Sequence, residues 1–350
     1  MDSEYMNKII IDGCEVGGSR TYIIAEIGSN HNQSIKLAFE SIDAAVECGA
    51  DAVKFQSIDV GELYYQPSEQ TKALHRKIDM AEEWHGLLSE YCRKKGITFF
   101  SAPTYLRAVD ILEEINVPLY KLASAQIGTF PQIIERVAAT GKPVILSTGI
   151  VTMKELKGVV DIFKRHNNDK FIILHCNSIY PTPYDKVHLN IMKQYRDEFN
   201  CIIGFSDHTP GIYVPIAATA LGAKVIEKHF ALDCTLPVPD APFSLEPDEF
   251  KRMVEGIRAA EQTLIDDSRK ELQPEENQFK DSILYRLVAN KNLVSGESVK
   301  AEDFKFLRHP EGIDCRELQK YLDGKVTYKK NIQQGVLLHL NDINYEGVIA

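Results

Sequence analysis

Two short runs in the second half of the chain, GFSDHT and VIEKHF, begin as apolar strand-like segments and end in a histidine. Alternate side chains of a strand share a face, so Ser206 and His208 point the same way, as do Glu227 and His229. If the two strands are neighbours in a parallel sheet, both imidazoles lie at its carboxyl edge. A single such histidine is more often a hydrogen-bonded core residue. The pair predicts a catalytic divalent metal, with His208 and His229 as ligands.

Two lysines lie inside other apolar, strand-like runs, Lys54 in AVKFQS and Lys121 in LYKLAS. A lysine buried in a strand is costly unless its charge is paired. Several other apolar runs end in serine, so ammonium and hydroxyl groups would face one space. This combination predicts a site for a small polyanion, such as a phosphate that also bears a carboxylate. The alternative is that each lysine forms an internal ion pair with Glu26 or Glu227.

The runs that carry these residues belong to a longer alternation of strand-like and helix-like segments. The strand-like runs are 22–28, 52–57, 98–103, 119–124, 144–148, 171–176, 202–207 and 224–230. Segments with helical apolar spacing separate them. Eight alternations predict an α/β fold, a (β/α)8 TIM barrel, with the polar residues at the carboxyl ends of its strands. An open doubly wound sheet is the alternative, but no G-x-G-x-x-G motif follows the first strand.

The chain has three predicted regions. A barrel domain covers 1–268, a polar linker covers 269–282, and a small, mostly β domain covers 283–350. Short strands are expected in the last domain at 287–289, 325–327 and 336–338, and we detect no internal repeat. Within the barrel, Asp79 and Thr152 are predicted helix N-caps, because a glutamate follows each of them three residues later.

The composition excludes several classes of partner. The 350 residues carry a formal net charge of −10 and are 44% hydrophobic, which argues against a nucleic-acid partner. We identify no membrane-spanning run and no signal peptide. The seven cysteines are dispersed without a C-x-x-C pair, as in a reduced, cytoplasmic protein. The expected protein is a cytoplasmic enzyme of the size of one large and one small domain.

Several motifs in order along the chain resemble the sialic acid synthase family. They are AEIGSNHN, VKFQ, YKLAS, ILSTG, HCNSIYP, FSDHT and EKHF, followed by Pro239, Asp240 and Ser244. The C-terminal region is similar to the antifreeze-like (SAF) domain of those enzymes. The resemblance implies condensation of phosphoenolpyruvate with an open-chain amino-sugar aldose similar to N-acetylmannosamine. The products would be a nonulosonic acid and phosphate.

The resemblance also implies roles for single residues. Manganese or magnesium would bind His208 and His229, and Glu26 would be the catalytic carboxylate. Phosphoenolpyruvate would contact Lys54, Lys121, Ser124, Ser147, Ser178 and Ser206. The sugar would contact Gln56, Gln126, Tyr180, Asp240 and Arg308. In the family, the arginine of the SAF domain enters the site of a second subunit, which implies a domain-swapped homodimer.

Three positions depart from the family pattern. Gln126 stands where relatives carry an acidic residue, Gln33 stands where they carry glycine, and Arg308 is followed by His-Pro-Glu-Gly rather than Pro-Gly. The acceptor sugar could therefore be of the legionaminic, pseudaminic or deaminated type, or one used for spore-coat polysaccharide. Two further kinds of protein fit part of the pattern: a deoxyoctulosonate-phosphate synthase, which would lack the SAF domain, and a catalytically silent sugar-binding paralogue. A Schiff-base lyase would need a lysine in an apolar pocket.

Overall fold

The computed structural model describes residues 8–264 and 271–345. The chain divides into two compact units, Met1–Ile265 and Asp266–Ala350. The division between the units lies three residues before the start of the predicted linker at 269–282.

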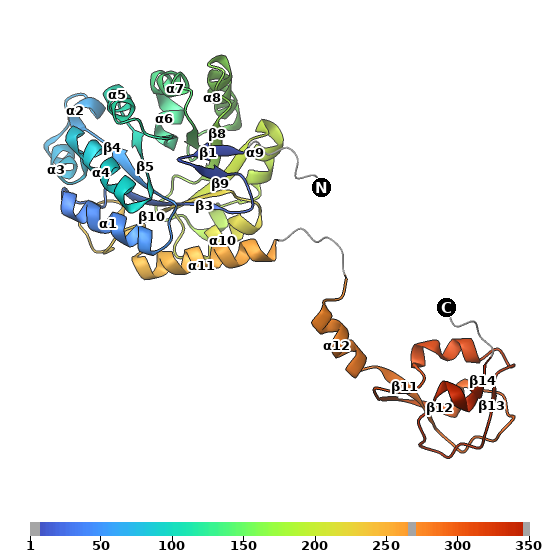
Figure 1. The fold of residues 1–350 in the computed structure, drawn as a ribbon. Helices are drawn as coiled ribbons and strands as arrows, with labels where there is room; N and C mark the ends of the chain where they lie inside the picture. Colours follow the sequence, from blue (N-terminus) through green and yellow to red (C-terminus); the bar gives the residue numbers. More distant parts are fainter. Residues whose placement is uncertain (1–7, 265–270, 346–350) are drawn as a thin grey trace. The chain divides into compact units, whose positions relative to one another are not determined.

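Eight parallel strands form the centre of the first unit (Figure 1). They are β3 (Tyr22–Gly28), β4 (Ala52–Ser57), β5 (Thr98–Pro103), β6 (Tyr120–Leu122), β7 (Val144–Ser147), β8 (Phe171–Cys176), β9 (Ile202–Asp207) and β10 (Val225–His229). Their order is β5-β4-β3-β10-β9-β8-β7-β6, and β5 also packs against β6, so the sheet is a nearly closed barrel. All eight strands lie where the sequence predicts them. The fourth is shorter than expected, since Ser124 begins a helix.

Helices surround the barrel on the outside (Figure 1). They are α1 (Ile35–Glu47), α2 (Val60–Leu63), α3 (Glu69–Ile78), α4 (Glu82–Lys95), α5 (Leu106–Glu114), α6 (Ser124–Thr129), α7 (Pro131–Ala138), α8 (Met153–Arg165), α9 (Ile191–Phe199), α10 (Tyr213–Ala220) and α11 (Pro247–Thr263). Helix α8 shows why they pack this way, because Leu156, Val159, Val160 and Phe163 form one buried face. Among the helices described, none combines the length and apolarity needed to cross a bilayer.

The two predicted N-caps differ in outcome. Thr152 caps α8 in a capping box with Glu155, as predicted. The prediction for Asp79 is wrong, because this residue ends α3 instead of starting α4, which follows Ala81. Its carboxylate accepts a hydrogen bond from the backbone N–H of Val60 and contacts His75. A contact distant in sequence therefore determines the position of this carboxylate.

Side chains that point into the barrel change from apolar to polar along most of the strands. Near the amino ends they form an inner core, which the hairpin of β1 (Ile9–Ile11) and β2 (Cys14–Val16) extends. On β3, for example, Tyr22 and Ile24 face inward and are followed two residues later by Glu26. Period-two alternation thus sends the polar residues of the strand ends to one mouth.

The second unit is built from short elements. They are α12 (Pro274–Ser282), the antiparallel pairs β11 (Tyr285–Ala289) with β12 (Phe304–Arg308) and β13 (Thr327–Tyr328) with β14 (Ile343–Asn344), and three 3-10 helices (Ala301–Asp303, Cys315–Tyr321 and Leu340–Asp342). Helix α12 lies within the segment predicted to be a linker. The strand expected at 336–338 is reduced to an isolated bridge between Val288 and Leu337.

The second unit also contains a repeat that the sequence analysis missed. The segments 293–304 and 332–343 have the same plan, and Leu293 and Ile332 exchange two backbone hydrogen bonds where the copies meet. Each copy ends in a 3-10 helix with a buried aspartate, Asp303 or Asp342, that pairs with a lysine. The sequence carries a signal for the repeat, because Lys-Asn followed by an aliphatic residue, then by glycine three residues later and aspartate ten residues later, occurs at 291–303 and again at 330–342.

Candidate functional site

A cavity of about 420 Å³ opens at the carboxyl ends of the barrel strands. The predicted site residues that line it are Glu26, Lys54, Gln56, Lys121, Ser124, Gln126, Ser147, Ser178, Tyr180, Ser206, His208, His229 and Asp240. Arg308 belongs to β12 of the second unit. The fold therefore brings all the predicted barrel residues to one place.

Two lysines and two carboxylates form a buried charge network in this mouth. Lys54 Nζ lies 2.7 Å from Glu26 Oε2 and 3.9 Å from Glu227 Oε2, and Lys121 Nζ lies 2.9 Å from Glu227 Oε1. Ser206 Oγ donates to the same Glu227 oxygen at 2.9 Å. The internal ion pairs predicted as the alternative for the two lysines are thus confirmed. The lysines also line the cavity, and their role in binding an anion stays a prediction.

The network shifts the pKa values of its two carboxyl groups in opposite directions. Although burial opposes ionisation of Glu227, the ammoniums of Lys121 and Lys54 hold the pKa of this carboxyl below its usual range. Burial raises the pKa of Glu26, which shares Lys54 with Glu227 and also accepts a hydrogen bond from Gln56 Nε2 at 2.8 Å. A carboxyl with a raised pKa in a cleft is suited to accept or donate a proton near neutral pH.

The two imidazoles meet as the sequence predicts, because β9 and β10 are adjacent. Their ring centroids lie 5.4 Å apart. Burial lowers the pKa of each histidine to about 4, so both rings are neutral at neutral pH. A neutral imidazole keeps the lone pair that metal coordination requires.

The hydrogen bonds of the two rings fit a metal site. His208 Nδ1 donates to the backbone oxygen of Asn177 at 2.8 Å, which leaves Nε2 as the free ligand atom. His229 Nδ1 is buried and has no hydrogen-bond partner within the described residues, and Asp240 Oδ2 lies 3.9 Å from it. Across 8–264 and 271–345, no group of three or more His, Cys, Asp or Glu side chains is arranged to hold a metal. The chain would thus supply two imidazoles and leave other positions open.

Hydroxyl and backbone groups line the side of the mouth near β7 and β8. Ser124 Oγ accepts a hydrogen bond from Gly149 N at 2.8 Å. Ser147 Oγ is buried and has no partner among the described residues. A Cβ atom at Gly149 would collide with Ser178 Oγ, so only glycine lets these hydroxyls approach the turn. Hydroxyl groups clustered in this way can donate hydrogen bonds to the oxygen atoms of an anion.

Aromatic and carboxylate groups stand at the rim. Tyr180, which is half exposed, packs its ring 4.3 Å from that of His208. Phe243 packs at 4.9 Å from the ring of His229. Asp240 Oδ2 accepts a hydrogen bond from Ser29 Oγ at 3.1 Å. These groups leave a polar and aromatic opening above the charge network.

Seven residues of the cavity wall were not predicted as site residues, and Glu227 and Cys176 are the two of them with ionisable side chains. Glu227 shares a face with His229, and this parity was the signal that it enters the mouth. Cys176 also lines the cavity, with Sγ 3.7 Å from Ser124 Oγ. His175 does not line the cavity: its ring packs on Phe205 and Tyr195, and its Nε2 lies 2.5 Å from Val187 O.

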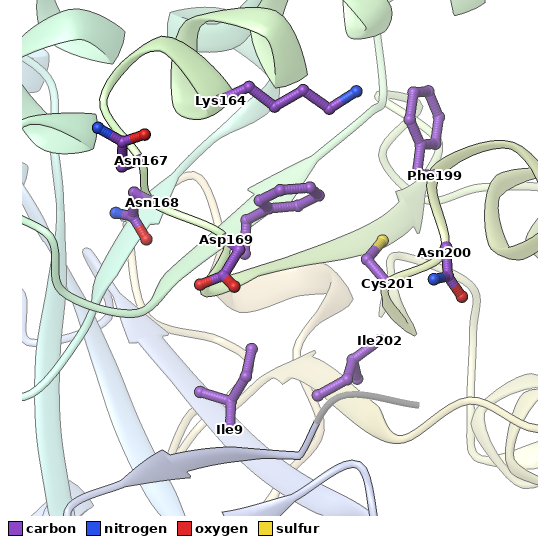
Figure 2. A pocket seen from close by; sticks show the side chains of 10 residues that line it. Ile9, Lys164, Asn167, Asn168, Asp169, Phe199, Asn200, Cys201 and Ile202 are labelled. Carbon is purple, nitrogen blue, oxygen red and sulfur yellow. The ribbon is translucent and has the colours of Figure 1, made fainter. Parts of the chain in front are cut away.

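A second cavity, of about 410 Å³, lies at the opposite ends of β8 and β9 (Figure 2). Its wall includes Lys164, Asp169 and Asn168 (Figure 2). The amide of Asn168 is used by the fold, since it donates to Ala138 O and Lys142 O and accepts from Lys170 N. This cavity lacks the imidazole pair and the lysine network of the mouth.

Known proteins resemble this chain along most of its length. The NeuB family model matches residues 41–269. The N,N'-diacetyllegionaminic acid synthase of Legionella pneumophila is 36% identical, covering 92% of this chain and 94% of its own, and a pseudaminic acid synthase of Campylobacter jejuni is 34% identical, with 92% and 96% covered. The crystal structure of N-acetylneuraminic acid synthetase from Leptospira borgpetersenii, in complex with citrate, is 32% identical and superposes with a TM-score of 0.73, over 80% of this chain and 99% of that one. The chain therefore belongs to the NeuB family of sugar-acid synthases.

Proposed function

We propose that this protein condenses phosphoenolpyruvate with the open-chain form of an N-acetylmannosamine-like aldose. The product would be a nonulosonic acid, and phosphate would be released by C–O cleavage. The observation that carries the proposal is the mouth itself, where two buried ammoniums and several hydroxyls lie beside a pair of neutral imidazoles. Such a site suits a small polyanion and a metal-assisted carbonyl reaction together.

The ammoniums and hydroxyls would bind phosphoenolpyruvate. Lys54 and Lys121 would face its negative charges, while Glu26 and Glu227 hold the two lysines in place before the ligand arrives. The hydroxyl groups proposed to complete the anion site are those of Ser124, Ser147, Ser178 and Ser206. Preorganised donors of this kind need little rearrangement when the charge moves during reaction.

His208 and His229 would hold a divalent ion, manganese or magnesium. Bound there, such an ion would polarise the aldehyde oxygen of the sugar as a Lewis acid. The hydrogen bond that His208 Nδ1–H donates to Asn177 O orients the ring for this role.

Glu26 would accept a proton from the attacking water and return it later in the reaction. The methylene carbon of phosphoenolpyruvate forms the new C–C bond with the aldehyde carbon. Water adds to the second carbon of phosphoenolpyruvate. Glu26 accepts one proton of this water and returns it to the former aldehyde oxygen, which becomes negatively charged when the C–C bond forms. Phosphate then leaves with the electron pair of the C–O bond and takes the proton of the added hydroxyl, so that the second carbon becomes a ketone. The raised pKa of Glu26 favours return of that proton later in the cycle.

The acceptor sugar would lie at the rim, against Gln56, Gln126, Tyr180 and Asp240. An amide at position 126 can donate to and accept from sugar hydroxyls but cannot act as a base. A diacetamido-trideoxyhexose, leading to a legionaminic or pseudaminic type of acid, is therefore the second candidate. It is supported by Gln126 and by the named activities of two relatives.

A phosphate-release assay with phosphoenolpyruvate and manganese would test the reaction. N-Acetylmannosamine, mannose and the diacetamido-trideoxyhexoses would be compared as acceptors. Oxygen-18 in the bridging position of phosphoenolpyruvate should appear in phosphate only if a carbon–oxygen bond breaks. Turnover with none of these acceptors, in protein that binds manganese, would overturn the proposal.

We also propose that residues 283–350 form a SAF domain whose Arg308 completes the mouth of a partner subunit. Arg308 is exposed on β12, with its guanidinium 5.3 Å above the Tyr285 ring. Mixed dimers of Arg308→Ala and Glu26→Gln, each poorly active alone, should recover about a quarter of the wild-type sites after unfolding and reassembly. No recovery in dimers verified as mixed would contradict the exchange of arginines.

A further inference from the structure

A second buried ion pair lies behind the mouth, on the outward faces of the same two strands. Because side chains alternate, Asp207 of β9 and Lys228 of β10 point away from the barrel axis. They are register partners, Lys228 Nζ lies 2.6 Å from Asp207 Oδ2, and both side chains are 0% exposed. Outward positions on these strands are otherwise apolar, as Phe205 and Ile226 show.

The pair forms hydrogen bonds with the residues next to His208. Asp207 accepts hydrogen bonds from Thr209 N at 2.9 Å and from Thr209 Oγ1 at 3.2 Å. Lys228 Nζ donates to Thr209 O as well as to Asp207. The ammonium therefore ties together the two residues on either side of His208, while Lys228 itself precedes His229.

Stability alone does not account for a charged pair at this place. Removing two charges from water costs about as much as their attraction returns, and apolar side chains of similar volume are often at least as stabilising. An apolar pair would also lack the link to Thr209 O. What the charged pair adds is a fixed geometry between the end of β9 and the end of β10.

We propose that Asp207 and Lys228 are positioning residues that set the relative placement of the His208 and His229 imidazoles. The inference rests on the proposed metal site and deepens it. The imidazole centroids, 5.4 Å apart, belong to residues that are each joined directly to a member of the pair. Loss of the pair should loosen this spacing without removing a ligand atom.

The test replaces the pair by apolar residues of similar size, Asp207→Leu with Lys228→Met. Manganese binding to the metal-free full-length protein is followed by electron paramagnetic resonance, and the unfolding midpoint is measured without metal. We expect a retained midpoint and manganese affinity lowered by about 10- to 100-fold, the range found for residues that orient metal ligands. Unchanged affinity in the folded double variant would show that the pair is structural only and would overturn the inference.

Two further variants keep the result interpretable. The control is the partly buried pair of Asp51 and Arg258, whose atoms lie 3.2 Å apart away from the mouth. Asp51→Leu with Arg258→Met should leave manganese affinity unchanged. If the Asp207/Lys228 double variant does not fold, Thr209→Val removes one hydrogen bond to Asp207 and should lower manganese affinity in the same direction by a smaller factor; unchanged affinity would then contradict the inference.

The wild-type protein separates this inference from the proposed function. If wild type binds one manganese ion and His229→Ala does not, the metal site stands, and the pair variants alone decide the inference. If wild type binds no manganese at millimolar concentration, both the metal site and the positioning role fail.

Discussion

Two of the cavities of the barrel, the mouth and the cavity at the amino ends of β8 and β9, have nearly the same size and opposite character. The mouth and the cavity at the amino ends measure about 420 and 410 Å³. In the mouth, buried Lys121 faces buried Glu227, and Ser147 Oγ and His229 Nδ1 are left without partners among the described residues. In the cavity at the amino ends (Figure 2), Lys164 and Asp169 are exposed. The side-chain amide of buried Asn168 is hydrogen-bonded to Ala138 O, Lys142 O and Lys170 N.

The comparison teaches that volume does not identify a functional site. A buried charge without a partner, or a buried polar atom without a hydrogen bond, costs free energy. In the mouth, buried charges and unpartnered polar atoms lie together beside a cavity, where a bound ligand could offset this cost. Mutations of the same chemical type in the two cavities should therefore have different consequences.

The largest difference is expected from changing a carboxylate to an amide. Glu26→Gln in the mouth should lower kcat by about 100- to 10,000-fold, because it removes a general base and keeps the shape. Asp169→Asn, the matching change at the amino ends, should leave kcat unchanged. Steady-state phosphate release measures both, and equal losses would abolish the distinction between the cavities.

Changing a lysine to methionine should produce the next largest difference. Lys121→Met leaves Glu227 buried with Lys54 as its remaining cation, at 3.9 Å, and should lower the free energy of unfolding by about 3–5 kcal/mol. Lys164→Met at an exposed position should change it by less than about 0.5 kcal/mol. Urea denaturation of the full chain provides the measurement, and a stable Lys121→Met protein would contradict the ion-pair network.

A smaller effect is expected from Ser147→Ala. Since Ser147 Oγ has no described partner, its loss should change the unfolding midpoint little. A hydrogen bond to a charged ligand is worth about 1.5–3 kcal/mol, so the affinity for phosphoenolpyruvate should fall by about 10- to 100-fold. Isothermal titration calorimetry would measure it; wild-type affinity would remove Ser147 from the anion site.

The smallest expected effect belongs to Asn168→Ala. In contrast to Ser147→Ala, it should lower the stability of the fold and leave the reaction unchanged. It leaves two buried carbonyl groups without their donor and should lower the free energy of unfolding by about 1–3 kcal/mol. Turnover should not change at a temperature where the protein is folded. A reduced kcat under those conditions would give the cavity at the amino ends a functional role that its geometry does not suggest.

Much of the barrel could be predicted from local patterns. The eight strands lie where apolar runs were found, and the shared face of His208 with Ser206 follows from period-two alternation. The cap at Thr152 is equally local. The error at Asp79 arises because Val60, distant in sequence, provides the partner of its carboxylate. The pair of Asp207 and Lys228 was missed for the same reason.

By itself, the sequence determined which residue types stand at the strand ends and on which face of each strand they lie. These properties depend on neighbours two residues away, so they can be read along the chain. Only the tertiary structure decided which groups the three lysines contact. Lys54 lies between the carboxylates of Glu26 and Glu227, Lys121 pairs with Glu227, and Lys228 donates a hydrogen bond to Thr209 O. Such pairings depend on which strands are adjacent and on their register, which follow from packing the whole barrel.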